Sequence, residues 1–372
     1  MYLNTHFNRH IKDLDKLKKQ CGMVHKYDEN SIFARYGYAF YNRTKKKLET
    51  PQKAVILPHK NPDGDALGST LALFHYLIQN KHEAIVISPN DYPGFLNWLP
   101  GQDQILKYNR SPKDVRHKID SATLIFTLDF NNLSRIGDLE PLIEKSTADK
   151  IMIDHHESPH EYASLTYSDV NMSSTCEMVY NLLNALNSEA FTGDIAKCLY
   201  TGIMTDTGSF RYPATTPTTH RVIARLIEAG ASSTEIHQNI YDNSSFSRLK
   251  LLGVTLSSLK KIANLPIVFM TITQEELNSC DFIKGDTEGF VNYGLSLEGI
   301  VFSCIMIENE SEGIIKMSFR SQGEFSVNDF ARAYFNGGGH HNAAGGMSAV
   351  SMKETVARFE KATQEVAENF KM

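Results

Sequence analysis

Short apolar runs alternate with segments of helical periodicity along the first two thirds of the chain. Four runs have the length of buried strands, namely "AVILP" from Ala54, "EAIVIS" from Glu83, "ATLIFTLDF" from Ala122 and "KIMID" from Lys150. Segments between them, such as "ALGSTLALFHYLIQ" from Ala66, carry apolar residues at helical spacing. Strands that alternate with helices predict crossover units, so we expect an α/β fold in which helices flank a mostly parallel sheet.

The pattern changes after Gly230, where the segment 233–262 predicts two consecutive helices with no strand between them. Three apolar runs of strand length follow, and then a short helix and a long final helix. The final helix has one apolar stripe that is expected to pack on a sheet. This stripe consists of Val356, Phe359, Ala362 and Val366. The C-terminal part is therefore predicted as a smaller α/β domain that a helical linker joins to the first.

These patterns divide the chain into four segments. We expect an N-terminal extension without an assigned role at residues 1–50, a first domain at 51–235, a linker at 236–262 and a second domain at 263–372. Within the extension, "IKDLDKLKKQ" has weak helical character, and the charged "NRTKKKLET" that ends at Thr50 is typical of a solvated linker.

The composition indicates a soluble globular protein, with 41% hydrophobic and 22% charged residues among 372 positions. No run of about 18 apolar residues predicts a membrane helix, and the polar N-terminus lacks the apolar centre of a secretory signal. Five scattered cysteines without CxxC spacing predict free thiols in a reducing cytoplasm, and no membrane partner is expected. They are Cys21, Cys176, Cys198, Cys280 and Cys304.

The formal net charge of −5 argues against a broad binding surface for long double-stranded nucleic acid. It leaves room for a small anionic ligand, because metal ions and a few local cations can hold a phosphate whatever the total charge.

Acids and histidines follow the apolar runs of the first domain, at the points where the expected strands end. The residues concerned are His59, Asp63, Asp65, Asp129, Asp154, His155 and His156, to which Asp206 adds a carboxylate at a helix-to-turn boundary. Because the carboxyl ends of parallel strands lie along one edge of an open sheet, we expect these side chains to converge there.

Such a gathering of carboxylates repels itself unless a cation neutralises it. Carboxylate oxygens with imidazole nitrogens suit Mn²⁺, Mg²⁺ or Fe²⁺, whereas a structural zinc site would favour thiolates. The candidate ligands are too many for one ion and would serve two ions that share a bridging carboxylate. Taken alone, "NPDGD" from Asn61 is equally typical of a turn, and Asp129 of a helix cap.

The same residues carry a family resemblance. "HKNPDGDALGS" from His59, "LDF" with "SRIGD", "IDHHESP" and "TGIMTDTGSF" resemble the four motifs of the DHH phosphoesterases, named after the triplet at 154–156. "SFRS" at 318–321 and "FNGGGHHNAAGG" at 335–346 resemble the C-terminal domain associated with that family, which binds substrate. The layout without further modules is most similar to the branch of oligoribonucleases and 3′-phosphoadenosine 5′-phosphate phosphatases.

The resemblance implies a catalytic first domain with two divalent ions, most typically Mn²⁺, with Mg²⁺ as the alternative. It implies that His59 and Asp63 bind the first ion, and that Asp129 bridges the two. The second ion would be bound by Asp65, His155 and Asp206. His156, Asp129 and Asp154 are the implied catalytic residues, with His156 and Asp154 beside the ligands and His156 able to approach the phosphate.

The second domain is implied to grip a terminal phosphate or nucleotide. The residues concerned are Arg320, Ser321, Gly337, Gly338, Gly339 and His340, and Arg135 of the first domain is a further candidate for the substrate-facing surface. A glycine loop lets backbone N–H groups approach a phosphate closely, and a guanidinium offers a bidentate donor. The family also suggests a homodimer.

The expected activity is metal-dependent hydrolysis of very short RNA to nucleoside monophosphates, together with removal of a phosphate from 3′-phosphoadenosine 5′-phosphate. Three alternatives stay open: hydrolysis of cyclic di-AMP or its linear product pApA, hydrolysis of pyrophosphate by a manganese enzyme, and a nucleotide sensor without catalysis. A sensor would be expected to have lost metal ligands, and none of the candidates is missing here.

Overall fold

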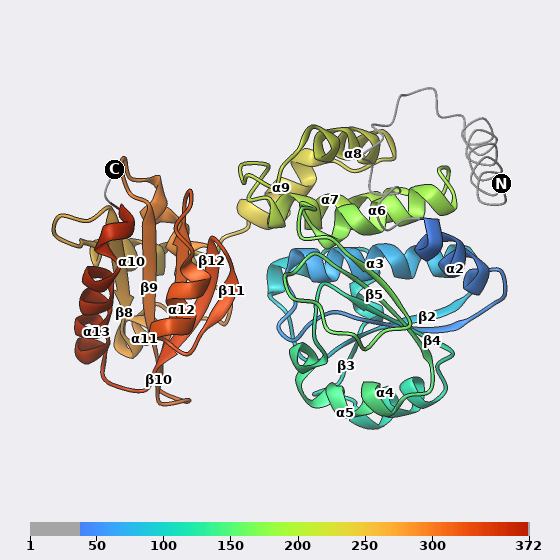
Figure 1. Cartoon of the computed structure of the whole chain (residues 1–372), viewed down its shortest axis with the longest axis horizontal. Coiled ribbons are helices and arrows are strands. Elements are labelled where there is room, and N and C mark those ends of the chain that lie inside the picture. The colour runs from blue at the N-terminus through green and yellow to red at the C-terminus, as the bar shows by residue number, and fades with distance from the viewer. Residues whose placement is uncertain (1–37, 371–372) are drawn as a thin grey trace, which may run out of the picture.

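A six-stranded parallel sheet lies at the centre of the N-terminal domain in the computed structural model, which describes residues 38–370 (Figure 1). Its strands run in the order β3-β2-β1-β4-β5-β6, and every neighbouring pair is parallel. The strands are β1 (Lys53–Leu57), β2 (Glu83–Ser88), β3 (Leu106–Lys107), β4 (Leu124–Leu128), β5 (Asp149–Asp154) and β6 (Leu165–Ser168). The predicted mostly parallel sheet is confirmed.

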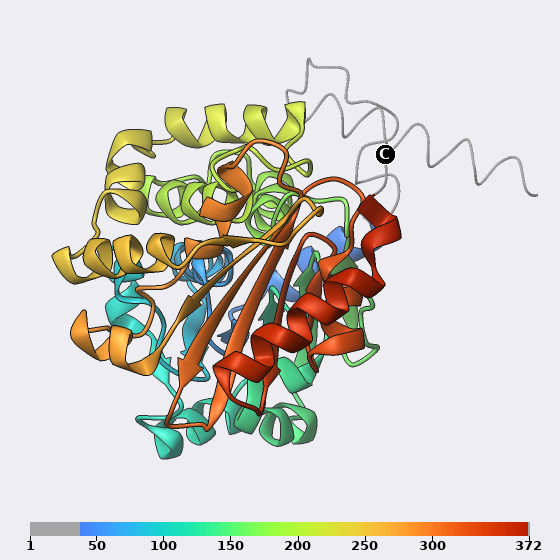
Figure 2. The same ribbon diagram turned by 90° about the vertical axis from the view of Figure 1, so that its left-hand side faces the viewer.

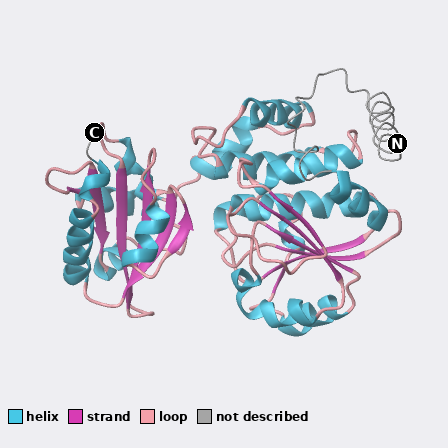
Figure 3. Cartoon of the chain, viewed as in Figure 1, coloured by secondary structure: helices cyan, strands magenta, loops and turns pink. Residues whose placement is uncertain are grey.

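Helices cover both faces of this sheet, which explains why its strands read as continuous apolar runs. Along β1, Ile56 packs into a core shared with the helices on one face, whereas Val55 packs with those on the other. The first face carries α2 (Tyr38–Leu48), α3 (Gly64–Gln79), α6 (Thr175–Leu186), α7 (Gly193–Asp206), α8 (Pro217–Glu228) and α9 (Ser233–Tyr241). The second carries α4 (Pro112–Asp120) and α5 (Glu140–Lys145), as Figure 3 shows.

Helices α3, α6 and α7 approach one another closely next to the carboxyl edge of the sheet. A Cβ atom on Gly202 of α7 would lie 2.2 Å from Cys176 Sγ and 2.9 Å from Asp65 Oδ1. Only glycine leaves room for this contact, so the packing of three helices fixes where the Asp65 carboxylate lies.

The C-terminal domain is built on a second six-stranded sheet in the order β11-β12-β10-β9-β8-β7. Its pairs are antiparallel except for β8 and β9. The strands are β7 (Lys260–Lys261), β8 (Ile267–Ile272), β9 (Phe302–Asn309), β10 (Ile314–Ser321), β11 (Gly338–His340) and β12 (Ala343–Ser348). An apolar core with α12 (Val327–Tyr334) and α13 (Met352–Glu365) lies on one face, and a core with α10 (Phe246–Ser257) and α11 (Gln274–Ser279) on the other. Figure 2 shows α13 in front of the sheet, roughly along the direction of its long strands. This domain agrees with the predicted smaller α/β unit.

Two segments differ from the sequence prediction. The glycine-rich stretch expected as a loop is partly the strand β11, because the glycines let its backbone approach β12: a Cβ on Gly337 would lie 1.9 Å from the Gly345 oxygen. The charged stretch expected as a linker is mostly α2, whose Phe40 is buried with its ring 5.5 Å from that of Tyr167. The segment "IKDLDKLKKQ" lies outside the described residues.

Residues 242–245 connect α9 of the first domain to α10, and the predicted boundaries at 50, 235 and 262 stay predictions. Short 3₁₀ turns complete the described elements: η2 (Gly94–Leu96), η3 (Gln102–Gln104), η4 (Leu133–Leu139), η5 (Phe290–Ser296) and η6 (Ala367–Phe370). Between residues 38 and 370, every helix is too short or too polar to cross a lipid bilayer.

Candidate active site

The candidate site lies where the strand order of the first sheet reverses. The chain proceeds from β1 outward to β2 and β3 on one side, and from β4 outward to β5 and β6 on the other. The crevice outside the carboxyl ends of such a central pair is where open α/β sheets bind ligands. The polar turn at 58–63 follows β1, and Asp129 directly follows β4.

The turn after β1 serves the backbone and the site together. Asp63 is the N-cap of α3, and its Oδ1 accepts hydrogen bonds from the amides of Asp65 and Ala66, both at 3.1 Å. Its other oxygen, Oδ2, lies 3.9 Å from Nε2 of His59. The capping bond therefore fixes the carboxylate in an orientation that leaves one oxygen facing the imidazole.

Asp129 lies between two groups of side chains. Its Oδ2 is 3.6 Å from Nε2 of His59, and its Oδ1 is 3.6 Å from Nε2 of His155. The residue is 2% exposed and has a left-handed backbone with φ of 67°. This conformation costs energy for most side chains but is tolerated by Asp and Asn, so an Asp at this position can adopt the sharp turn after β4 that aims its carboxylate into the site.

The second group contains the remaining predicted ligands. His155 Nε2 lies 3.5 Å from Asp206 Oδ2 and 3.9 Å from Asp65 Oδ2. The ligand atoms of these three residues all lie within 4.8 Å of one another, as do those of His59, Asp63 and Asp129. The structure thus brings together all six residues named as metal-ligand candidates, in the two groups that the family resemblance implies.

The protonation equilibria of the site show its excess of negative charge. Burial and the charges of Asp129 and Asp206 raise the pKa of Asp65 well above its usual value. Burial also raises the pKa of Asp206 to about 6, although His155 opposes the shift. Conversely, the surrounding acids overcome burial and raise the pKa of His155 to about 9. A divalent cation would relieve the same repulsion, and the oxygen and imidazole donors suit Mn²⁺ or Mg²⁺.

The third residue of the DHH triplet faces the second domain. His156 Nδ1 lies 2.7 Å from Asp154 Oδ1 and donates to it, because a carboxylate only accepts. The second oxygen of Asp154 is buried, and no group among residues 38–370 forms a hydrogen bond with it. The His156 ring stacks on that of His340, with centroids 4.4 Å apart and planes at 30°. The two domains therefore meet at these two imidazoles.

Among the residues expected to bind substrate, Arg320 has no carboxylate partner at positions 38–370, whereas Ser321 and Gly339 form hydrogen bonds within their own domain. Arg320 is half-buried, and in the described part of the chain no carboxylate lies within 4.0 Å of its guanidinium. Ser321 is engaged inside the domain, where its hydroxyl donates to the Phe325 carbonyl at 2.6 Å. The amide of Gly339 donates to Asn328 Oδ1 at 2.9 Å.

The amide of Gly337 likewise donates within its own domain, to the Ala331 carbonyl at 3.1 Å, while Gly338 is half-buried in β11. Burial, His156 and His155 lower the pKa of His340 to about 3, so its ring is neutral beside the site. Arg135 of η4 is exposed, and its charge acts on both His59 and His340. Arg320, His340 and Arg135 are thus the cationic or donor groups that border the cluster.

Comparison with known proteins agrees with this geometry. The model of the DHH family, N-terminal domain, matches residues 53–203, and that of the DHHA1 domain matches residues 278–371. A bifunctional oligoribonuclease and PAP phosphatase NrnA of Thermus thermophilus is 32% identical over 303 residues, which cover 81% of this chain and 85% of that protein. The chain belongs to the DHH family.

Two further similarities define its position among DHH proteins. A crystal structure of an exopolyphosphatase-related protein from Bacteroides fragilis has a TM-score of 0.87 and 39% identity, covering 90% of this chain and 98% of that one. The cyclic-di-AMP phosphodiesterase GdpP of Bacillus subtilis is 27% identical over 327 residues, which cover 84% of this chain and 48% of GdpP.

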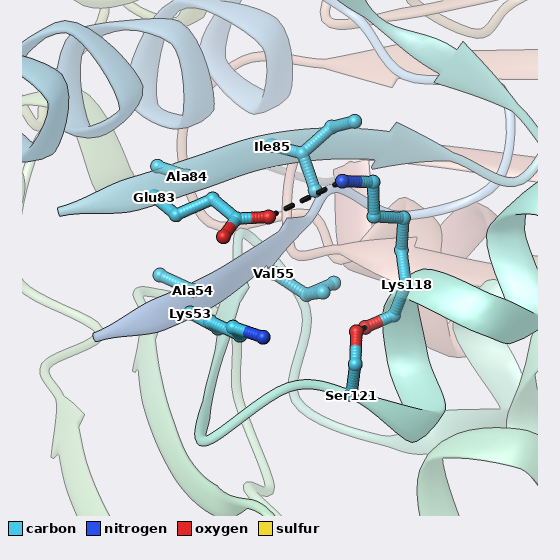
Figure 4. A pocket seen from close by; sticks show the side chains of 8 residues that line it. All are labelled: Lys53, Ala54, Val55, Glu83, Ala84, Ile85, Lys118 and Ser121. Carbon is cyan, nitrogen blue, oxygen red and sulfur yellow. Dashed lines mark hydrogen bonds and ion pairs between the residues drawn. The ribbon is translucent and has the colours of Figure 1, made fainter.

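A shallow pocket elsewhere on the first sheet does not compete with this site. It lies at the amino ends of β1 and β2, the opposite edge from the acidic cluster, and is lined by residues such as Lys53, Glu83 and Lys118 (Figure 4). Its volume of about 50 Å³ is far below that of a nucleotide pocket, and an ion pair between Lys118 and Glu83 crosses it.

The amino end of α6 supports the cluster and was missed by sequence reasoning. The amides of Thr175 and Cys176 donate to Asp65 Oδ2 at 2.7 Å and Oδ1 at 2.8 Å. The Thr175 hydroxyl donates to Asp129 Oδ1 at 2.9 Å. The N-cap Ser174 marked a helix start, but nothing in the sequence indicated that this helix would point at residues 46 and 110 positions away.

Replacing Thr175 with Val is expected to weaken Mn²⁺ binding roughly ten- to a hundredfold, the usual effect of losing a group that orients a metal ligand. Valine has the same shape and keeps the backbone amide to Asp65, so only the hydroxyl bond to Asp129 is lost. Calorimetric titration of the metal-free protein with Mn²⁺ measures the change. Thr175→Ser is the matched control and should retain affinity, whereas equal affinities of all three proteins would show that the hydroxyl has no such role.

Proposed function

We propose that this DHH protein is a two-metal phosphoesterase that hydrolyses very short RNA to nucleoside monophosphates and 3′-phosphoadenosine 5′-phosphate to AMP. The observation that carries the proposal is the position of Asp129. One of its carboxylate oxygens faces the group of His59 and Asp63, and the other faces that of Asp65, His155 and Asp206. A bridging carboxylate between two sets of oxygen and nitrogen donors is the arrangement that a pair of divalent ions requires.

We further propose that Mn²⁺ is the preferred ion and that Mg²⁺ can replace it. His59, Asp63 and Asp129 would hold one ion, and Asp65, His155, Asp206 and Asp129 the other. When bound, two such ions supply electrostatic stabilisation of a phosphoryl group and activate water near neutral pH. The protein contributes fixed ligands, since Asp63 is held by the α3 amides and Asp65 by the α6 amides.

The second domain supplies the grip on the substrate. Arg320 has no carboxylate partner within 4.0 Å among residues 38–370, so its half-buried charge is available for a phosphate. His340 is neutral and close to His156, so it can donate a hydrogen bond to a phosphate without adding charge. Because both groups lie on the second domain, the substrate would be enclosed between the two domains, which excludes long duplexes.

A second candidate activity, hydrolysis of cyclic di-AMP or pApA, is favoured by the similarity to GdpP over 84% of this chain. The same metal cluster could serve it, because the reacting group is again a phosphodiester. The similarity to an exopolyphosphatase-related protein makes inorganic polyphosphate and pyrophosphate necessary arms of any test.

In the deciding experiment, the purified protein is incubated in the presence of Mn²⁺ with each of six substrates, one substrate in each reaction. These are an RNA trimer, 3′-phosphoadenosine 5′-phosphate, pApA, cyclic di-AMP, pyrophosphate and polyphosphate. We expect turnover of the RNA trimer, of 3′-phosphoadenosine 5′-phosphate and also of pApA, because pApA is itself a two-nucleotide RNA. Turnover confined to cyclic di-AMP or to the inorganic substrates would overturn the proposal, and so would the absence of any turnover. A cytoplasmic location and a homodimer remain predictions.

A further inference from the structure

Two exposed tyrosines lie beside the cluster and have no part in the chemistry described so far. Tyr212 is 41% exposed and follows α7 by six positions, while Tyr241 ends α9 and is 46% exposed. The two are neighbours, because the pKa of Tyr241 is raised by burial and, next, by the phenol of Tyr212. Two neighbouring aromatic side chains that stay exposed next to a site offer a contiguous apolar surface to a ligand.

The Tyr212 ring lies flat against glycine. Gly208 has φ of 56°, and a Cβ built on it would fall 2.5 Å from Cζ of the Tyr212 ring and 2.8 Å from both Cε atoms. The backbone of Gly208 therefore covers one face of the Tyr212 ring, and the exposed area of the side chain belongs to the parts of the ring that Gly208 does not cover. Gly208 is only two residues beyond Asp206, so the ring is tied to the end of the helix that carries a metal-ligand candidate.

The loop that presents this ring is held rigidly. Gly208, Ser209 and Phe210 are three consecutive residues with left-handed backbone, which for the latter two costs roughly 1–3 kcal/mol each. Hydrogen bonds maintain this shape: Phe210 N–H donates to Thr207 Oγ1 at 3.1 Å, and Ser209 Oγ lies 3.1 Å from His237 Nε2. His237 belongs to α9, and its ring lies 5.9 Å from that of Tyr241. The contact between Ser209 and His237 therefore connects the loop that carries Tyr212 to the helix that carries Tyr241.

Charged groups of both domains surround the tyrosines. The Arg211 side chain is held by its Nε, which donates to the Gly208 carbonyl at 2.8 Å. Arg320 of β10 is near enough for Tyr212, Glu288 and Asp206 to influence its charge. Glu288 likewise acts on Tyr241 and is acted on by Asp63. Tyr212 is thus a neighbour of Arg320, the residue proposed to bind phosphate, and it follows Asp206 by six positions.

We propose that Tyr212 and Tyr241 form a base-stacking wall of the substrate site, with Tyr212 receiving the base of the nucleotide whose phosphate Arg320 holds. An aromatic face next to a guanidinium is the combination that binds single-stranded nucleotides without base preference. The inference rests on the proposed function and deepens it: it makes the substrate a nucleotide and separates this chain from enzymes acting on inorganic phosphate chains.

The test compares equilibrium binding of AMP and ribose 5-phosphate in the presence of Mn²⁺, because the two probes differ only in the base. Tyr212→Ala should weaken AMP binding roughly ten- to a hundredfold and leave ribose 5-phosphate binding unchanged. Tyr212→Phe keeps the ring and should restore AMP affinity, and Tyr241→Ala should give a smaller loss. If Tyr212→Ala does not fold, Tyr212→Leu covers Gly208 without an aromatic face and decides in its place.

If Tyr212→Ala weakened the binding of AMP and of ribose 5-phosphate equally, or weakened neither, the proposed stacking role of the tyrosines would be wrong. These outcomes are distinguishable from failure of the proposed function. Suppose that the unmodified protein hydrolyses no short RNA, but that Tyr212→Ala weakens AMP binding and leaves ribose 5-phosphate binding unchanged. The stacking role of Tyr212 would then be supported and the proposed reaction would be wrong. If instead the unmodified protein hydrolyses short RNA and the tyrosine variants bind AMP as tightly as it does, the proposed reaction would be supported and the stacking role would be wrong.

Discussion

Replacing Asp129 with Asn is expected to lower kcat on an RNA trimer by a factor of about 10³ or more. The carboxylate faces both candidate metal groups. Two correctly placed metal ions stabilise the charge of the transition state by several kcal/mol, and this stabilisation would depend on the bridging carboxylate. Asn tolerates the left-handed backbone at this position and can still accept the Thr175 hydrogen bond, so the fold should survive. Initial rates at saturating Mn²⁺ and the number of bound ions per chain measure the effect.

The matched control is Asp120→Asn, which neutralises an exposed acid at the end of α4 on the other face of the sheet. It should retain two ions and full activity. We also expect Mn²⁺ to raise the unfolding temperature of the Asp129→Asn protein less than that of the unmodified protein, because binding to the native state is the source of the increase. Full turnover with two bound ions in the variant would exclude a bridging role for Asp129.

Replacing Arg320 with Ala should raise KM for the RNA trimer roughly a hundredfold, while kcat changes little and Mn²⁺ binding is retained. A hydrogen bond to a charged group contributes about 1.5–3 kcal/mol, and the larger value corresponds to this change. Arg320→Lys should recover only part of the affinity, since a point charge lacks the planar fork. Steady-state kinetics with a parallel Mn²⁺ titration separate the two properties.

Lys316→Ala provides the control for Arg320, because it removes a cation from the same strand that is exposed and paired with Glu312 at 2.8 Å. It should leave KM unchanged. If Arg320→Ala gave an unaltered KM, or weakened Mn²⁺ binding as strongly as substrate binding, Arg320 would not be the phosphate-binding group.

The sequence predicted the part of the site that depends on local order. Parallel strands end at one edge, so acids that follow β1, β4 and β5 had to converge whatever the details of packing. The end of α7 could be placed in the same way, because an apolar periodic segment stops at Asp206. These regularities identify the metal-ligand candidates without knowledge of any distance.

The support around these ligands could not be predicted, because it depends on which helix packs against which. Thr175 meets Asp65 only because the glycine contacts of α3, α6 and α7 set the distance between the helices. The strand β11 was read as a loop, since glycine has low strand propensity and its role appears only with β12 alongside. Tyr212 carried no signal in the sequence, because its exposure and its neighbours follow from a strained loop and a second domain.

The amide bonds at the amino end of α6 have a consequence for which ions the protein can use. Both oxygens of Asp65 are held by backbone N–H groups, and Asp63 is fixed in the same manner by α3. Carboxylates anchored in this way cannot withdraw to make room for a wider coordination shell. Ca²⁺ requires six to eight oxygens at about 2.3–2.6 Å in a flexible cage, whereas Mg²⁺ accepts a tight octahedron at about 2.0–2.1 Å. If Asp63 and Asp65 bind metal as proposed, we therefore expect the protein to bind Mn²⁺ or Mg²⁺ more tightly than Ca²⁺.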